Sequence, residues 1–323
     1  MTLLLTNEEV RKAVTMHDAI AAMQDGCLEE NAGKAILPHR INIKVGAGWL
    51  RVGPVALEQS GWMGFKAMNL TPGQGVRYQV HLYDIATGAL VSIMDAQHLT
   101  TLRTGATSAL ATKLMARPGK VVTALLGSGP EAQAQLDAML AIDYVSEVRI
   151  FSPTEANRER VAQQYRDGGI NAIAVPSSEA ACDNASLILA AVKSTEPVLI
   201  GRWLTPGTHI NSVGTARPEQ RELDLAVFER VETVVVDTKE GVFGEAGDAI
   251  AAREIVTQKN VFELHELVGG SVKGRQSDDE ISLFKSVGTG IQDIALAVRI
   301  YRNAFEQGLG TELGEFPYLK RNK

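Results

Sequence analysis

The chain has 323 residues, of which 45% are hydrophobic and 22% charged, a composition that excludes intrinsic disorder and a fibrous repeat. Its 32 Lys and Arg against 38 Asp and Glu residues give a net charge of −6, which argues against nucleic acid or an anionic membrane as the main partner. Two cysteines, Cys27 and Cys182, are too few for a disulfide framework. At about 150 residues per domain, the length predicts two domains.

No apolar run approaches the roughly 18 residues of a membrane-spanning helix. The segment Met1–Glu9 lacks the basic and then apolar pattern of a secretory signal. We therefore expect no membrane partner and a cytoplasmic location.

The first third of the chain predicts helices beside a largely antiparallel sheet. Residues 7–31 have helical spacing of apolar side chains, with Asn7 as the expected cap. Helical spacing returns at Thr100–Met115 and ends at Arg117-Pro118-Gly119, which we take as a boundary. Between these helices, strand-like patterns occur at Ile41–Val45, Gly64–Met68, Gln79–Tyr83 and Leu90–Met94.

After Gly119, short apolar runs alternate with helical segments. This alternation is typical of βαβ units with a parallel sheet covered on both faces. The expected strands are Val121–Leu126, Val148–Phe151, Ala172–Val175, Leu187–Ala190, His209–Val213 and Val234–Val236.

The run Val121–Leu126 leads directly into residues 127–132, which read GSGPEA and fit the dinucleotide-binding pattern G-x-G-x-x-A. The first glycine permits the tight turn, and the second lets the backbone approach a pyrophosphate at the helix N-terminus. A glycine turn in a nucleotide-free α/β domain is the alternative. The predicted ligands of the dinucleotide are Gly127, Ser128, Gly129 and Pro130.

The second strand of this unit indicates which dinucleotide binds. NAD sites typically have a carboxylate about 20 residues beyond the glycine motif, where it binds the ribose 2′-OH. Here the strand ends in Phe151-Ser152-Pro153-Thr154, and Arg158 follows. Hydroxyls and arginine suit a 2′-phosphate, so Ser152, Thr154 and Arg158 favour NADP(H), with NAD(H) as the alternative. Glu155 and an ordinary solvated role for Arg158 weigh against this interpretation.

Three cations precede the dinucleotide motif. Lys66 lies in a strand-like apolar run, Arg103 opens an Ala-rich helix, and Arg40 precedes another strand. Cations in such settings need an anionic partner. A small carboxylate substrate is one candidate, because arginine binds carboxylates bidentately and a lysine with a lowered pKa can deliver a proton. Structural salt bridges are the alternative.

A set of short segments spread along the chain carries a further signal. The segments are Met94-Asp95, Leu102–Ala109, Ala116–Gly119, Gly127–Gly129, Pro206–Gly214, Arg217-Pro218, Glu222-Leu223, Glu245–Asp248 and Phe284–Gly288. They resemble those of the ornithine cyclodeaminase/mu-crystallin family, and the resemblance covers nearly the whole chain. From the matching segments we add Thr104, Val213 and Gly214 to the predicted cofactor-binding residues.

The resemblance implies a homodimer in which a Rossmann dinucleotide-binding domain is inserted into a smaller α+β domain for substrate binding and dimerisation. We place the smaller domain at residues 1–118, completed by 292–323, and the Rossmann domain at 119–291. By the same resemblance, Arg40, Lys66 and Arg103 bind the substrate carboxylate. Lys66 and Arg103 are the expected catalytic residues, with the lysine as the acid-base group.

One departure from the family bears on the reaction. Cyclodeaminases have an acidic residue shortly after the Asn-x-x-Gly motif, but here Ala216 stands at that position, and a methyl group cannot accept a proton. Glu245 and Asp248 are the acids considered as replacements, with helix capping as their alternative role. Ala216 therefore favours a reductase over ornithine cyclisation.

Other polar residues receive no catalytic role. His209 lies in a strand-like run and is expected to be an interior histidine, and Cys182 has no basic neighbour in sequence that would make it a nucleophile. Asp95 is the remaining acid considered for the site. The histidines lack metal-ligand spacing, so no metal is predicted.

The sequence thus predicts an NAD(P)H-dependent reductase of 2-imino acids. Cyclic ketimines of the pyrroline- or piperideine-2-carboxylate type are the first choice of substrate, and the related amino-acid dehydrogenase reaction is the same chemistry reversed. The alternatives are an ornithine cyclodeaminase-type ammonia lyase and a non-catalytic NADP- or hormone-binding protein.

Overall fold

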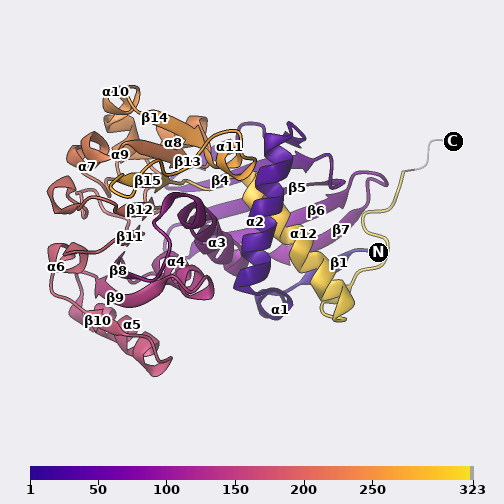
Figure 1. Ribbon diagram of the computed structural model, residues 1–323. Coiled ribbons are helices and arrows are strands. Elements are labelled where there is room, and N and C mark those ends of the chain that lie inside the picture. The colour runs from indigo at the N-terminus through magenta and orange to yellow at the C-terminus, as the bar shows by residue number, and fades with distance from the viewer. Residues whose placement is uncertain (321–323) are drawn as a thin grey trace. The chain divides into compact units, whose positions relative to one another are not determined.

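The computed structural model describes residues 1–320 and divides into two compact units. Unit 1 consists of Met1–Arg103 and the chain from Thr289 onward, and unit 2 is Thr104–Gly288. Each unit is built around its own eight-stranded sheet (Figure 1).

The sheet of unit 1 has the order β16-β1-β7-β6-β5-β4-β2, with β3 also paired to β4. Neighbouring strands are antiparallel except β1 and β7, which are parallel. The strands are β1 (Leu3–Leu5), β2 (Ala35–Ile36), β3 (Ile41–Val45), β4 (Gly48–Leu57), β5 (Trp62–Thr71), β6 (Gly75–Asp84), β7 (Leu90–Asp95) and β16 (Thr311–Glu312).

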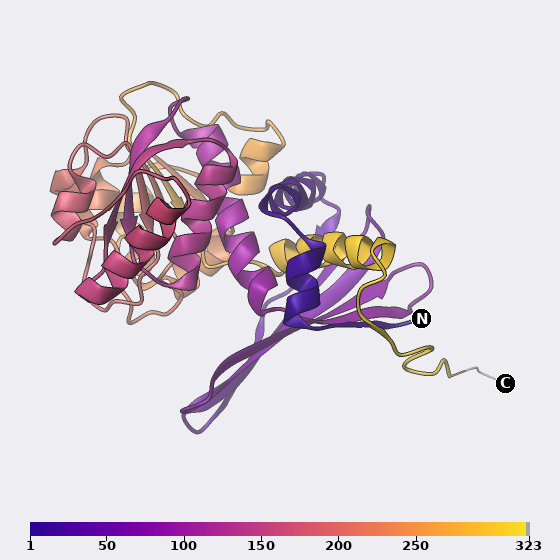
Figure 2. The same cartoon turned by 90° about the horizontal axis from the view of Figure 1, so that it is seen from below.

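One face of this sheet is covered by helices α2 (Met16–Asn31) and α12 (Gly290–Glu306), which lie side by side (Figure 1). Gly26 permits their close approach, because a Cβ there would lie 3.1 Å from the Cβ of Ala295. The far ends of β3 to β6 project beyond these helices (Figure 2), and all five residues of β3 are exposed.

The expected single helical stretch at residues 7–31 is two helices, α1 (Asn7–Ala13) and α2. Thr6 and Thr15 cap them, each accepting a hydrogen bond from the backbone N–H three residues on. Asn7 is therefore the first helical residue and not the cap, because the hydroxyl of Thr6 already fills that role within a capping box.

The sheet of unit 2 is parallel throughout, with the order β10-β9-β8-β11-β12-β15-β13-β14. Its first five strands follow the doubly wound arrangement of dinucleotide-binding folds, in which the strand order reverses between β8 and β11. The expected α/β fold of Rossmann type is confirmed. The strands are β8 (Val121–Leu126), β9 (Val145–Phe151), β10 (Ala172–Ala174), β11 (Leu187–Ala190), β12 (His209–Ser212), β13 (Thr233–Val236), β14 (Asn260–Glu263) and β15 (Ser282–Lys285).

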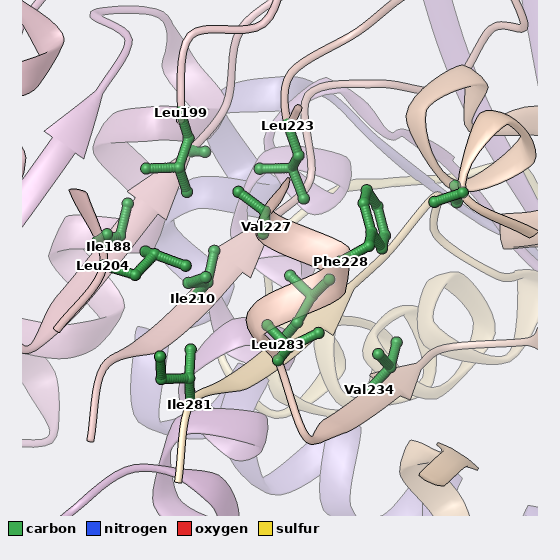
Figure 3. Close-up of a cluster of buried hydrophobic side chains, with 14 of the residues drawn as sticks. Ile188, Leu199, Leu204, Ile210, Leu223, Val227, Phe228, Val234, Ile281 and Leu283 are labelled. Carbon is green, nitrogen blue, oxygen red and sulfur yellow. The ribbon is translucent and has the colours of Figure 1, made fainter. Parts of the chain in front are cut away.

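The connecting helices of unit 2 begin with the second part of α3 (Gln97–Met115). The others are α4 (Pro130–Ala141), α5 (Glu155–Asp167), α6 (Ser178–Cys182), α7 (Leu225–Arg230), α8 (Lys239–Glu245), α9 (Gly247–Ala251), α10 (Arg253–Val256) and α11 (Leu264–Val268), with a 3-10 turn at Gly201–Trp203. A buried apolar cluster packs α6 to α10 against the sheet; Figure 3 shows Phe228 and Val227 of α7 against Ile210 and Leu283 of β12 and β15.

The division between units differs from the expected boundaries at 118/119 and 291/292. The first boundary lies after Arg103, inside the continuous helix α3, and the second lies after Gly288. The reason is packing: Gly105 of α3 lies so close to α4 that a Cβ there would be 2.1 Å from the carbonyl oxygen of Ala134. The turn at residues 117–119 ends the helix without separating the units.

Candidate functional site

Lys66 lies on β5, on the face of the sheet that the helices cover. Its cross-strand partner Val80 on β6 is fully buried, as is Met94, which pairs with Val80 from β7, and Lys66 itself is only 3% exposed. An ammonium group in such surroundings requires a partner. Asp293 of α12 provides one, with its two carboxylate oxygens each 2.8 Å from the lysine Nζ.

Arg103 meets the same carboxylate. Its Nε lies 3.2 Å from Oδ1 of Asp293, and its Nη1 donates to Oε1 of Gln292 at 2.9 Å. Two of the predicted cations are thus brought together around one buried acid. Neither Gln292 nor Asp293 was among the predicted site residues. Their signal in the sequence was a pair of polar residues on the otherwise apolar segment 290–298 of α12, all buried in the structure.

Arg40 is the third predicted cation. It is half-buried just before β3, and a Cβ on Gly53 of the neighbouring strand would lie 3.8 Å from its Cγ. Its positive charge is close enough to help lower the pKa of Lys66. The structure therefore gathers Arg40, Lys66 and Arg103 in one region of unit 1.

The protonation of Lys66 is balanced near neutrality. Burial lowers its pKa to about 7, since the charged form loses its hydration. The carboxylate of Asp293 opposes this effect, whereas the charges of Arg103 and Arg40 reinforce it. A lysine with a pKa close to the working pH can both give and accept a proton, as a general acid-base group must.

In unit 2, the predicted dinucleotide loop connects β8 to α4. Gly127 has φ = +120°, and a Cβ there would lie 2.7 Å from the carbonyl oxygen of Ala191, so both conformation and space require glycine. A Cβ on Gly129 would meet nothing within 4 Å, which leaves room for a ligand to approach the backbone. Pro130 is the first residue of α4 and Gly129 its cap, so the helix N-terminus faces the loop as an anion site requires.

A pocket of about 270 Å³ lies beside this loop. The ends of β8 and β9 form one wall, and the segment after β11 forms the other. Its lining residues are Leu126, Gly127, Phe151, Pro153, Val192, Lys193, Ser194 and Val198.

The residues predicted to choose between NADP and NAD lie at the end of β9. The buried Ser152 hydroxyl is 3.1 Å from that of Ser128, and Arg158 Nη1 donates to the carbonyl oxygen of Ser152 at 3.2 Å. Arg158 also lies 3.9 Å from Glu155, a weak ion pair. Thr154 is exposed at the N-terminus of α5.

The remaining predicted cofactor residues belong to neighbouring segments of unit 2. Thr104 is buried in α3, one residue before the close contact with α4. Val213 follows β12, and its N–H bonds to the carbonyl oxygen of Ala190 at the end of β11. Gly214 comes next, at the same edge of the sheet as the dinucleotide loop.

Asp248, one candidate to replace the acid missing at Ala216, is engaged elsewhere. It is 1% exposed and pairs with Lys285 at 3.0 Å. It also accepts N–H bonds from Glu222 and Leu223. Asp248 is therefore a structural anchor. Glu245 is the last residue of α8, and the exposed Asp95 accepts the N–H of Gln97 at the start of α3.

His209 and Cys182 are interior residues. His209 is fully buried beside Ser282 at 2.9 Å, and burial lowers its pKa to about 3, so it is neutral. Burial raises the pKa of Cys182 to about 12, which makes its thiol a poor nucleophile.

Residues 1–308 match the sequence profile of the Ornithine cyclodeaminase/mu-crystallin family. The chain belongs to this family. Among its relatives, an alanine dehydrogenase of Archaeoglobus fulgidus is 31% identical over 98% of this chain and 99% of its own length. A Delta(1)-pyrroline-2-carboxylate reductase of Bacillus cereus is 29% identical over 96% of this chain and 99% of its own.

Solved structures of the family have the same fold. A Thermococcus litoralis Delta(1)-pyrroline-2-carboxylate reductase, solved with NADH and L-proline, is 33% identical with a TM-score of 0.91, covering 97% of this chain and 100% of that one. An archaeal alanine dehydrogenase dimer with bound NAD is 31% identical with a TM-score of 0.92, covering 98% of this chain and 99% of that one. Within residues 1–320, no helix of this family member is both long and apolar enough to cross a membrane.

Proposed function

We propose that this family member is an NAD(P)H-dependent reductase of 2-imino acids, with cyclic ketimines of the pyrroline- or piperideine-2-carboxylate type as substrates. The observation that carries the proposal is the buried Lys66, which shares the carboxylate of Asp293 with Arg103 and has a pKa of about 7. The pyrroline-2-carboxylate reductases among its relatives support the choice of substrate.

The residues of unit 1 bind and protonate the imino acid. Arg103 and Arg40 attract its carboxylate, and the planar fork of an arginine suits two carboxylate oxygens. Lys66, in its protonated form, donates a proton to the imine nitrogen directly or through water, which keeps the C=N carbon electrophilic. Asp293 holds the ammonium group in place. The reduced nicotinamide supplies the hydride that the carbon accepts.

In unit 2, the proposed cofactor contacts are those of the dinucleotide loop and the adjoining strands. The open space at Gly129 and the N-terminus of α4 suit a pyrophosphate, and the adjacent pocket suits the adenosine half. We propose NADP(H) as the preferred form, because the end of β9 carries Ser152 and Arg158 where an NAD site has a carboxylate. NAD(H) is the alternative, since related structures contain NADH or NAD.

We further propose a homodimer, with unit 1 as the substrate-binding and dimerisation domain and unit 2 as the dinucleotide-binding domain. The sheet of unit 1 exposes Ile41, Ile43 and Val45 on β3, with exposed fractions of 56%, 49% and 70%. Together with Leu50 they form an apolar face opposite to Lys66. A second copy of the chain would cover it, as the dimeric state of the related alanine dehydrogenase suggests.

The deciding experiment follows nicotinamide absorbance with preformed cyclic ketimines and, separately, with 2-oxo acids plus ammonia or methylamine. Reduction of a cyclic ketimine with the highest kcat/KM supports the proposal. Preferred turnover of pyruvate with ammonia would instead support the amino-acid dehydrogenase reaction, which the 31% identical alanine dehydrogenase makes the second candidate.

Two other outcomes would contradict the proposal. Ammonia release from ornithine without lasting cofactor consumption would indicate a cyclodeaminase, although Ala216 and the engaged Asp248 argue against it. Tight cofactor binding with no turnover of any imino acid would indicate a non-catalytic binding protein.

A further inference from the structure

Unit 2 contains a buried ionic cluster that the proposed reaction does not use. Lys285 of β15 is 0% exposed, as is Glu222, and Asp248 of α9 is 1% exposed. The Lys285 ammonium group donates to the hydroxyls of Ser212 and Thr215 and to Asp248, so all three of its protons have acceptors.

The two carboxyl groups of this cluster differ in their surroundings. Burial raises the pKa of Glu222 despite the charge of Lys285, which lies 3.7 Å away. Burial also acts to raise the pKa of Asp248, but Lys285 and the hydrogen bonds outweigh it and lower the pKa overall. Asp248 is thus the main counter-ion of Lys285, and Glu222 accepts hydrogen bonds from its neighbours.

The Glu222 carboxylate joins two loops at the carboxyl edge of the sheet. Its Oε1 accepts the N–H of Val192, which follows β11, at 2.7 Å. Its Oε2 accepts the N–H of Gly214, which follows β12, at 3.2 Å, and the hydroxyl of Ser212. One buried side chain therefore fixes the backbone of both loops.

The backbone of Glu222 holds the other end of the first loop, residues 192–199. Its carbonyl oxygen accepts the N–H groups of Val198 and Leu199 at 2.9 and 3.1 Å. The N–H of Arg221 bonds to the carbonyl oxygen of Ser194 at 2.8 Å. Four residues of this loop line the pocket beside the dinucleotide motif: Val192, Lys193, Ser194 and Val198.

The second loop, which contains Gly214 after β12, is packed directly against the 192–199 loop. A Cβ on Gly214 would lie 2.3 Å from the backbone nitrogen and oxygen of Val192 and 2.5 Å from Oε1 of Glu222. Because nothing larger than glycine fits, the backbones of the two loops are in direct contact at Gly214.

From this arrangement we infer that Glu222 is a positioning residue for the cofactor, which sets the 192–199 loop and Gly214 at the spacing that the bound dinucleotide requires. The inference rests on the proposed cofactor site of unit 2. Glu222 is buried beneath the loops and acts through their backbone. Lys285 and Asp248 hold it there.

The test compares Glu222→Gln with Ser212→Ala. The glutamine keeps an acceptor for one N–H group but turns a donor toward the other. Because Lys285 and Asp248 form a neutral pair without Glu222, the variant leaves no unpaired buried charge. Ser212→Ala removes a hydroxyl from the same cluster and spares both loop N–H bonds.

Two measurements decide the question: the Kd of NADPH and NADH from nicotinamide fluorescence, and amide hydrogen exchange of peptides covering residues 190–199 and 212–216. We expect Glu222→Gln to raise the Kd at least fivefold more than Ser212→Ala and to speed exchange in both peptides. A smaller difference in Kd, or equal exchange in the two variants, overturns the inference in favour of a merely structural cluster.

Two controls keep the results separable. If Glu222→Gln does not fold, the shorter Glu222→Asp, which keeps the charge but cannot reach both N–H groups, is judged by the same thresholds. If the unmodified protein binds neither dinucleotide, the proposed function fails; binding by the unmodified protein with no difference between variants refutes the positioning role alone.

Discussion

The ammonium group of Lys66 lies 2.8 Å from the carboxylate of Asp293, although 227 residues separate them in the chain. The N-terminal sheet supplies the lysine and a helix from the far end of the chain supplies the acid. Since Asp293 also pairs with Arg103, one carboxylate holds two cations in place while a substrate carboxylate is expected to approach them. The proposed chemistry of unit 1 depends on this pair.

Replacing Lys66 by methionine should abolish turnover while leaving cofactor affinity nearly unchanged. The unbranched methionine side chain fills similar apolar space but carries no proton, and loss of a general acid costs about 10²- to 10⁴-fold in rate. The measurements are kcat/KM on the best ketimine and the Kd of NADPH, which we expect within a few-fold of the unmodified protein. Normal turnover by the variant would remove Lys66 from the mechanism.

The pH dependence of the two reaction directions should be opposite. Lys66, with a pKa of about 7 in the free protein, is protonated below that pH and neutral above it. Reduction needs the acid, so its kcat/KM should fall as the pH rises through about 7. Oxidation of the amino acid needs the base, so its kcat/KM should rise over the same range. If kcat/KM rises with pH in both reaction directions, or falls with pH in both, Lys66 does not have this role.

Asp293→Asn should shift the fall in kcat/KM for reduction, which occurs as the pH rises, to a lower pH. The carboxylate raises the pKa of Lys66 against the effect of burial, and removing an opposite charge at this distance typically shifts a pKa by about one unit or more. The pH profile of kcat/KM separates this shift from a general loss of stability, which would lower activity at every pH. An unshifted fall in a folded variant would show that Asp293 does not control the lysine.

The parts of this structure that depend on residues close together in the sequence were predictable from the sequence. The strand Val121–Leu126 and the glycine turn after it follow from local pattern; the structure has this strand with the expected bounds, and α4 begins directly after the turn. Strand β4 (Gly48–Leu57) was not predicted, since Gly53 and Pro54 interrupt its pattern, and pairing with β2, β3 and β5 holds it in the sheet. Asp293 was missed because its partner Lys66 is remote in the sequence. The division of the chain after Arg103 has no signal in the local sequence either, because it lies within a continuous helix.

Gly129→Val should weaken cofactor binding without destabilising the fold. Apart from its chain neighbours, a Cβ at this position has no heavy atom within 4 Å, so the substitution causes no backbone clash and adds bulk where the pyrophosphate would approach. We expect the Kd of NADPH to rise at least about tenfold with little change in Tm. Gly244→Val is the matched control, since a Cβ there also meets nothing within 4 Å. Unchanged affinity of the Gly129 variant would refute the loop assignment.

Cofactor preference tests the interpretation of the end of β9. The unmodified protein should have a higher kcat/KM with NADPH than with NADH. Ser152→Asp should reverse this order, because a carboxylate repels a 2′-phosphate and accepts a ribose hydroxyl. Ser152→Asn, of the same size but uncharged, controls for crowding beside Ser128. A tenfold preference of the unmodified protein for NADH would show that Ser152, Thr154 and Arg158 do not select NADP.

The apolar face of unit 1 predicts how the dimer can be disrupted. Ile43 lies on β3 opposite Leu50 of β4 and is 49% exposed. Burying a lysine at this position against a second copy would cost several kcal/mol, so Ile43→Lys should yield monomers at micromolar concentration in sedimentation velocity. Lys44→Ala, on the other face of the same strand, should leave the dimer intact. A dimer that survives Ile43→Lys would place the interface elsewhere on the protein.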